Sequence, residues 1–214
     1  KNIWNVHGGF NFERSEIKLP FLKKKFFTFG SFNNLNKVSD ENLKVWAKII
    51  SRVKNSRLLL KSSISYNLDS FIEKLKQYNL FEKVDIIKRK EDFKTHLNLY
   101  DQVDLALDTF PYNGVTTTFE ALWKGVPVLT LQGYNFNSRC GSSIIKNLGE
   151  KSLLSNSKDQ YVEKAVYLAT NINKLAELRM NLYKNLFKTP LFDIVTFSKN
   201  FEKLLYEVIN EKLN

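Results

Sequence analysis

A glycine followed by a run of hydroxyl side chains is the clearest chemical signal in this sequence. Gly114 and Val115 precede the triplet Thr116, Thr117 and Thr118. Glycine permits a positive φ and a close approach of the backbone, and threonine hydroxyls can cap a helix whose free N–H groups carry about half a positive charge. One hydroxyl would suffice to cap a helix after a plain turn, so three in a row favour contact with an anionic ligand. The pattern predicts a diphosphate.

Three further side chains are candidates for the same site. Glu120 lies about one helical turn after Thr116, where a carboxylate can accept hydrogen bonds from both ribose hydroxyls, although an exposed acidic residue near a helix start is also a common dipole partner. Lys37 ends the polar segment 33–37, and its ammonium can neutralise a departing diphosphate or simply be solvated. His96 is one of two histidines. Its residue type is as compatible with a surface or capping role as with ligand binding.

The spacing of apolar residues predicts short strands that alternate with helices. An alternation of this kind favours an α/β fold: a Rossmann-like parallel sheet with helices on both faces, and ligands at the carboxyl ends of the strands. The segment 33–37 and the block that contains Gly114 both follow strands, so we expect them to converge on one edge of the sheet. The expected strands are 26–32, 56–61, 84–87, 103–107 and 127–131, and the expected helices are 40–53, 69–78, 92–100, 116–123, 157–170, 172–187 and 197–213.

Three segments are expected along the 214 residues. Residues 1–25 show neither helical nor strand period and contain Gly8, Gly9 and Pro20, so we interpret them as a linker. Residues 26–187 are expected to form the Rossmann-like domain that the alternation predicts, which the family resemblance described below implies to be nucleotide-sugar-binding, and residues 188–214 are expected to contain a C-terminal helix.

The basic composition does not favour nucleic-acid binding. The formal net charge is +11, but only six of the 33 basic residues are arginine, the side chain that best reads bases. The lysines are spread over nearly every segment, which is typical of a solvated surface that attracts small anions or acidic partners. We therefore expect no nucleic-acid partner.

Membrane, disulfide and metal chemistry are not indicated by the sequence. No run of eighteen apolar residues occurs, which argues against a membrane-spanning helix and a membrane partner. Cys140 is the only cysteine, and no cluster of Cys and His has the spacing of metal ligands. We expect a cytoplasmic protein in a reducing compartment, with no metal site and no cofactor.

Five blocks of sequence together point to a known family. The blocks are 29–37, 55–61, 107–130, Ser138-Arg139 with Ser143, and 189–192. In their order and spacing they resemble the catalytic C-terminal half of the O-linked N-acetylglucosamine transferase and SPINDLY family. The resemblance spans roughly residues 20–212 and implies a B-type glycosyltransferase, in which two Rossmann-like domains face each other across a cleft, usually behind tetratricopeptide repeats that recruit the protein acceptor. This chain resembles the C-terminal half, which holds the nucleotide-sugar donor, with a C-terminal helix that can cross back to a missing N-terminal catalytic half.

The resemblance also implies roles for single residues. Lys37 matches a lysine that contacts the donor diphosphate and is needed for activity, so it is the expected catalytic residue. Asn34 and His96 match residues near the nucleotide, and Thr116 and Thr117 match the pair that holds the diphosphate. Together with the candidates from the residue pattern, the expected donor-binding set is Asn34, Lys37, His96, Gly114, Thr116, Thr117, Thr118 and Glu120.

Glu120 replaces an acidic residue that the family has at the ribose, in agreement with the role inferred from the residue pattern. The sequence departs from the family in two places. Val115 stands where the O-linked N-acetylglucosamine enzymes have a histidine, and the segment 88–93, expected to line the base, does not match closely. The sequence of residues 110–118 is more similar to the SPINDLY branch of the family, whose plant members use GDP-fucose.

The implied activity is inverting O-glycosyl transfer from UDP-N-acetylglucosamine or a similar donor to protein serine or threonine. GDP-fucose-dependent O-fucosyl transfer and a non-catalytic nucleotide-sugar-binding module are the alternatives. An unrelated Rossmann-like dinucleotide enzyme is disfavoured, because the chain lacks the G-x-G-x-x-G turn. Histidines that the family attributes to the other half of the cleft are absent here. We therefore expect this chain to bind nucleotide but to transfer no sugar by itself.

Overall fold

The computed structural model describes residues 4–5, 14, 17, 19–63, 67–88 and 92–213. The strands in this part of the chain are β1 Phe27–Ser31, β2 Ser56–Ser62, β3 Val84–Lys88, β4 Leu105–Leu107, β5 Val128–Leu131 and β6 Leu154–Ser155. The α-helices are α1 Pro20–Lys24, α2 Asp40–Arg52, α3 Asp69–Gln77, α4 Phe93–Asn98, α5 Thr116–Trp123, α6 Cys140–Leu148, α7 Lys158–Thr170, α8 Ile172–Asn185 and α9 Ile194–Leu213. Short 3-10 turns are η1 Leu35–Lys37, η2 Phe81–Lys83, η3 Leu99–Gln102, η4 Lys151–Leu153 and η5 Leu186–Lys188.

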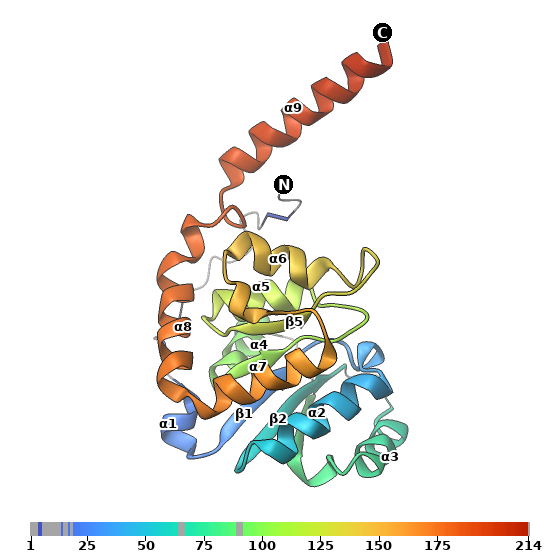
Figure 1. Cartoon of the computed structure of the whole chain (residues 1–214), viewed down its shortest axis with the longest axis vertical. Helices are drawn as coiled ribbons and strands as arrows, with labels where there is room; N and C mark the ends of the chain where they lie inside the picture. The colour runs from blue at the N-terminus through green and yellow to red at the C-terminus, as the bar shows by residue number, and fades with distance from the viewer. Residues whose placement is uncertain are drawn as a thin grey trace.

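The described strands form one parallel sheet in the order β3-β2-β1-β4-β5-β6. The first strand, β1, therefore lies in the middle of the sheet. Strands β2 and β3 follow on one side of β1, and β4, β5 and β6 follow on its other side (Figure 1). In a Rossmann-like sheet of this order, ligands bind at the topological switch point, which is formed by the carboxyl ends of the two neighbouring strands at which the strand order changes direction. In this chain those strands are β1 and β4.

Apolar residues of β2, β4 and β5 alternate between two cores, so helices cover both faces of the sheet. In β2, Leu58 and Leu60 join the core that contains side chains of α2, α3 and α7, whereas Leu59 joins the core formed with α4 and α5. Helices α2 and α7 pack against each other on the first face (Figure 1). The predicted α/β fold with a parallel sheet covered on both faces is confirmed.

Two predictions of local structure were wrong, and two elements were not predicted. Residues 20–24, expected to be irregular, form α1, because Pro20 occupies the first turn, where its missing N–H is tolerated. The helix expected at 92–100 ends as α4 at Asn98 and continues as the 3-10 turn η3. Neither β6 nor α6 was predicted as an element. A two-residue strand shows no period, and small residues such as Gly141 and Ser142 lie on the buried side of α6.

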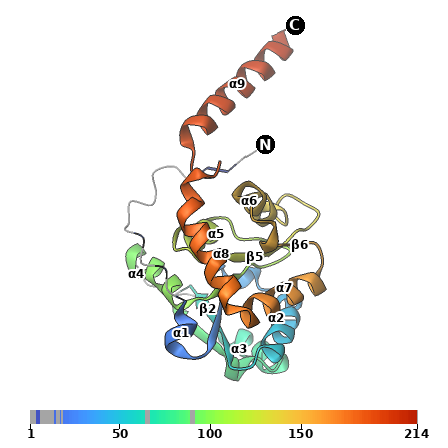
Figure 2. The same ribbon diagram turned by 60° about the vertical axis from the view of Figure 1, so that its left-hand side comes forward.

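Helix α9 extends away from the packed body (Figures 1 and 2). Leu186 and Leu191 are both buried, so the body continues past the expected boundary at residue 188, and α9 begins only at Ile194. Apolar side chains such as Phe201 and Leu205 are exposed along α9. Among the helices described here, none has both the length and the apolar character needed to span a lipid bilayer.

Candidate functional site

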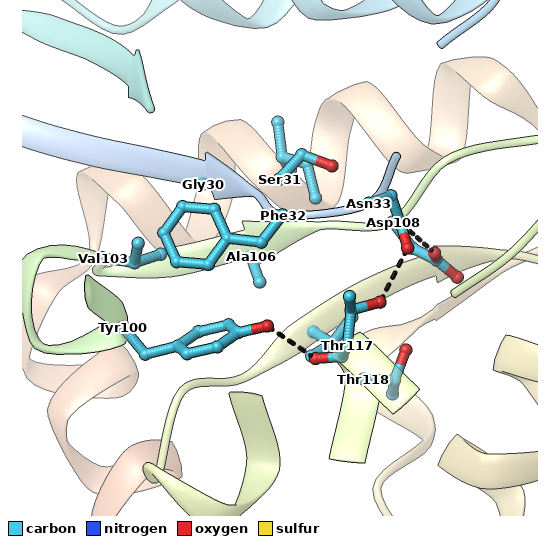
Figure 3. A pocket seen from close by; sticks show the side chains of 12 residues that line it. Gly30, Ser31, Phe32, Asn33, Tyr100, Val103, Ala106, Asp108, Thr117 and Thr118 are labelled. Carbon is cyan, nitrogen blue, oxygen red and sulfur yellow. Dashed lines mark hydrogen bonds between the residues drawn. The ribbon is translucent and has the colours of Figure 1, made fainter. Parts of the chain in front are cut away.

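Asn33, directly after β1, joins the loops that follow the two central strands. Its side-chain amide donates to Asp108 Oδ1 at 3.2 Å and to Thr109 Oγ1 at 3.0 Å, and its Oδ1 accepts from the Thr117 hydroxyl at 2.6 Å. Figure 3 shows the side chains of Asn33, Asp108 and Thr117 pointing toward one another in a pocket lined by residues of β1, β4 and the start of α5. The predicted convergence of these segments on one edge of the sheet is confirmed.

Asp108, directly after β4, is a buried carboxylate with several hydrogen-bond donors around it. Besides Asn33, it accepts from the Gly114 N–H at 2.7 Å and from the Thr130 hydroxyl at 2.7 Å. Burial raises the pKa of Asp108 to about 6, although these hydrogen bonds act in the opposite direction. The hydrogen bond to Gly114 fixes the turn that leads into α5.

Gly114 has no room for a side chain. A Cβ at this position would lie 2.4 Å from Thr117 Oγ1 and 2.6 Å from Asn33 Oδ1. The glycine is required because the turn packs directly against the side chains that tie β1 to α5.

Lys37, at the end of η1, lies beside this turn. Its ammonium donates to the Asn113 carbonyl at 3.2 Å and lies 4.1 Å from the centroid of the Tyr112 ring. The side chain is half-buried, and burial lowers the pKa of Lys37, while the charges of Asp108 and Cys140 act to raise it. The structure thus brings Lys37 and the Gly114 turn together from loops that follow different strands.

The first turn of α5 has no side-chain cap, so the expectation that a threonine hydroxyl caps this helix was wrong. The N-cap residue is Val115, which has no side-chain oxygen. The Thr117 hydroxyl donates to Asn33, and the Thr118 hydroxyl donates to the Gly114 carbonyl at 3.2 Å. Thr116 is exposed. Uncapped N–H groups at a helix start can bind an anion. We call Gly114, Thr116, Thr117 and the Lys37 ammonium the candidate anion site. The geometry does not favour direct ligand contact by Thr118.

Glu120 and His96 form a buried polar cluster with Tyr100. Glu120 and His96 are only 5% and 7% exposed. Glu120 Oε2 accepts hydrogen bonds from His96 Nε2 at 2.9 Å and from the Tyr100 hydroxyl at 3.0 Å. The pKa of Tyr100 is raised well above its ordinary value, mainly by burial and then by the Glu120 charge. Glu120 is therefore not a solvated partner of the helix dipole, and its contact with a ribose stays a prediction.

Tyr100 connects this cluster to the candidate anion site. Its hydroxyl is 3.1 Å from the Thr117 carbonyl, as the dashed line in Figure 3 marks. Tyr100 also follows His96 by four residues, which places both side chains on the same side of the α4–η3 segment. The histidine side and the anion side of the site are therefore adjacent.

The remaining predicted positions are Asn34 and the segment 88–93, for which we describe only local contacts or contacts with His96. Asn34 is exposed, and its side-chain oxygen accepts from the Asn36 N–H at 3.0 Å, so it orders the turn that ends at Lys37. In the segment 88–93, residues 89–91 lie outside the described part of the chain. Phe93 is exposed, with its ring 6.0 Å from that of His96.

Sequence reasoning assigned no role to four residues that the structure places in or beside the site: Asn33, Asp108, Tyr100 and Lys61. Asn33 and Asp108 each directly follow a predicted strand, and this position was the available signal, because such residues lie at the ligand-binding edge of a parallel sheet. Lys61, the last residue of a predicted strand, offered the same signal.

The candidate anion site can hold a diphosphate at the start of α5 and place the Lys37 ammonium against it. In the described ranges, no group of three or more His, Cys, Asp or Glu side chains is arranged to hold a metal ion.

Two curated proteins that are similar to this chain have the same enzyme name. The SPINDLY protein of Solanum lycopersicum, named "probable UDP-N-acetylglucosamine–peptide N-acetylglucosaminyltransferase", is 40% identical over 190 residues, which cover 86% of this chain and 20% of that protein. The Arabidopsis thaliana protein SEC, which has the same enzyme name, is 32% identical over 208 residues, or 92% of this chain and 20% of that protein. The chain therefore spans about one fifth of the length of these curated relatives.

Solved structures share the fold. A mutant of the Thermobaculum terrenum O-GlcNAc transferase superposes with a TM-score of 0.79 at 30% identity, over 90% of this chain and 38% of that one. The C-terminal domain of a Francisella tularensis group 1 glycosyl transferase superposes with a TM-score of 0.62 at 15% identity, over 82% of this chain and 93% of that one, which shows the fold alone. The profile of "Glycosyl transferase family 41" matches residues 13–201. With its six-stranded parallel sheet and the loops that meet at its switch point, this chain belongs to glycosyl transferase family 41 and forms the C-terminal half of a B-type glycosyltransferase fold.

Proposed function

We propose that this chain binds the nucleotide-sugar donor of an inverting protein O-glycosyltransferase. The observation that carries the proposal is the contact between Lys37 and the Asn113 carbonyl, at 3.2 Å, in the turn before the uncapped start of α5. This contact places an ammonium beside the turn that leads into the uncapped first turn of α5, an arrangement that suits the two phosphates of a nucleoside diphosphate.

The proposed reaction is a single displacement at the anomeric carbon of the donor sugar. A serine or threonine oxygen of the acceptor protein forms the new bond, the bond to the diphosphate oxygen breaks, and the hydroxyl proton passes to a base. Lys37 and the N–H groups of Thr116 and Thr117 stabilise the charge that develops on the departing diphosphate. We assign the base to an N-terminal catalytic half of the whole protein, and acceptor recruitment to tetratricopeptide repeats.

The donor is proposed to be UDP-N-acetylglucosamine or a similar nucleotide sugar. The chain is 40% identical to a SPINDLY protein and 32% identical to SEC, and both relatives are named for UDP-N-acetylglucosamine. GDP-fucose is the alternative donor, which the SPINDLY-like sequence of residues 110–118 suggests. A non-catalytic nucleotide-sugar-binding module is the other alternative. As part of the proposal, the protein acts in the cytoplasm, since its one cysteine is a free, buried thiol that suits a reducing compartment.

Ligand-induced stabilisation tests the binding half of the proposal. A ligand at about 100 times its Kd stabilises the native state by about 2.7 kcal/mol, which raises Tm measurably. UDP, GDP and their sugars are compared on the parent chain, on Lys37→Ala and on Lys48→Ala, an exposed lysine of α2. We expect one nucleotide series to raise the Tm of the parent and of Lys48→Ala, and to have a much smaller effect on Lys37→Ala.

Activity of the full-length protein tests the catalytic half. Lys37→Ala is expected to abolish sugar transfer to an acceptor peptide, whereas Lys48→Ala retains it. Unchanged transfer in Lys37→Ala would show that the catalytic assignment is wrong, and binding without any transfer in the parent would favour the non-catalytic module. Turnover by the 214-residue chain alone would contradict the proposed need for another half.

A further inference from the structure

Tyr112 lies in the loop between β4 and α5, and the Lys37 ammonium lies over its ring. The distance from the ammonium to the ring centroid is 4.1 Å, and the same ammonium donates to the Asn113 carbonyl at 3.2 Å. A cation within about 6 Å of a ring centroid is attracted by the negative face of the ring. Two consecutive residues of one loop therefore hold the ammonium, one through its side chain and the other through its backbone.

The backbone of this loop is fixed by hydrogen bonds on both sides of the ring. The Tyr112 carbonyl accepts from the Thr109 hydroxyl at 2.6 Å, and the Asn113 side-chain amide donates to the Thr109 carbonyl at 2.8 Å. The Asn113 N–H donates to the Asn137 carbonyl at 3.1 Å, and the Gly141 N–H donates to Asn113 Oδ1 at 3.2 Å. Both contacts of the ammonium are thus carried by backbone that is held in place.

The Tyr112 ring does not serve core packing. It is 47% exposed, whereas the nearby Phe110 and Asn113 are buried. In the described part of the chain, neither of the two hydrophobic clusters includes Tyr112. An aromatic ring that stays exposed at the ligand-binding edge of the sheet, with a cation over its face, indicates a role in the site.

Restraining the ammonium lowers the entropic cost of binding an anion. A free lysine side chain has many rotamers, and it loses them when its ammonium is fixed against a ligand. The ring restricts Lys37 before the ligand arrives, and because the ring is uncharged, the ammonium keeps its full charge for the anion. An ammonium has three N–H donors, and the Asn113 carbonyl takes one of them. Donors therefore remain for phosphate oxygens.

We propose that Tyr112 is a positioning residue for the candidate anion site. Its ring holds the Lys37 ammonium where it meets the diphosphate of the donor, and it acts through Lys37 without contacting the diphosphate itself. The inference rests on the proposed function, which places the diphosphate at this site.

Calorimetric titration with inorganic pyrophosphate tests the role of the ring. For Tyr112→Leu, which removes the aromatic face and keeps an apolar side chain, we expect about fivefold weaker binding than for the parent. Tyr112→Phe keeps the face and should bind like the parent. Phe81→Leu is the matched control, because Phe81 is also 47% exposed and its ring lies 5.6 Å from the Lys76 ammonium, at the amino end of β3. This control should also bind like the parent.

A double-mutant cycle shows whether the ring acts through Lys37. In a Lys37→Ala background, Tyr112→Leu should weaken pyrophosphate binding no further. A ring that contacted the anion itself, or that only kept the loop in shape, would cause the same fivefold loss with or without Lys37. Phosphorus NMR at millimolar pyrophosphate measures the Lys37→Ala variants if their binding is too weak for calorimetry.

Proton NMR of the lysine side chains reports the contact itself. Protons held over the face of an aromatic ring are shifted upfield, and the Lys37 ε-CH₂ signal is the one absent from Lys37→Ala. We expect an upfield-shifted signal in the parent and in Tyr112→Phe, and loss of the shift in Tyr112→Leu.

The proposal is wrong if Tyr112→Leu binds pyrophosphate like the parent, if Tyr112→Phe loses as much affinity as Tyr112→Leu, or if the loss persists in full without Lys37. If Tyr112→Leu does not fold, Tyr112→Met is used, and the same outcomes decide. If the parent binds neither pyrophosphate nor a nucleoside diphosphate, the proposed function fails. A parent Lys37 signal without an upfield shift would overturn the ring contact in either case.

Discussion

Replacing Asp108 by asparagine should change how the stability of this chain depends on pH. The carboxylate is 2% exposed, and burial raises its pKa from 3.8 to about 6. Between these two values the folded chain holds a proton that the unfolded chain has released. The contribution of Asp108 to stability is therefore largest below pH 3.8 and is lost as the pH rises through about 6.

The size of this effect follows from the two pKa values. At about 1.4 kcal/mol per pH unit, a rise from 3.8 to about 6 corresponds to about 3 kcal/mol of stability lost at neutral pH. An asparagine carries no charge, and its oxygen can accept from the Gly114 N–H while its NH₂ group donates to the Thr130 hydroxyl. The variant should therefore keep the hydrogen bonds that fix the turn and lose the pH dependence.

Urea unfolding at a series of pH values, followed by tryptophan fluorescence, measures this directly, since Trp46 is buried in the core. We expect the free energy of unfolding of Asp108→Asn, relative to the parent, to rise by about 2–3 kcal/mol between about pH 4 and about pH 7.5. Asp85→Asn is the control of opposite sign, because hydrogen bonding to Arg57 lowers the pKa of Asp85. A difference between Asp108→Asn and the parent that is the same at both pH values would refute the assignment of a buried, ionised Asp108.

Three other changes test the geometry of the site and the role of α9. Gly114→Ala should lower the free energy of unfolding by about 1–3 kcal/mol or more and abolish pyrophosphate binding, because its Cβ would clash with Thr117 and Asn33. Gly149→Ala, at a φ of 81° but with open space around it, should cost only about 1 kcal/mol and leave binding intact. Equal effects of the two variants in urea unfolding and in titration would contradict the packing argument. Thr117→Val should destabilise the chain by about 1 kcal/mol relative to Thr117→Ser, which keeps the hydroxyl that bonds Asn33, and identical urea midpoints for the two would show that this bond contributes nothing. Deletion of residues 194–214 should leave Tm unchanged in calorimetry, because the described side chains of α9 are exposed or, for Phe197, half-buried. A clear drop in Tm would mean that α9 packs against the body.

The local features of the fold and half of the site geometry were readable from the sequence. Short apolar runs and helix periods are properties of neighbouring residues, so the parallel α/β sheet and the helix at 116–123 followed from them. Because parallel strands end at one edge, the meeting of Lys37 with the Gly114 turn followed as well. None of these features depends on knowing which distant side chains touch.

Tertiary structure alone decided the partners and the burial of the polar side chains. The spacing of Glu120 from Thr116 specified a helix face, but only the packing of α4 against α5 made it a buried partner of His96. Asn33 contacts Asp108 and Thr117 across separations of 75 and 84 residues, and those contacts exist because β4 pairs with β1. The pKa of Asp108 and the use of the threonine hydroxyls follow from the same pairing, since desolvation and hydrogen-bond partners are set by what the sheet order brings together and not by local sequence.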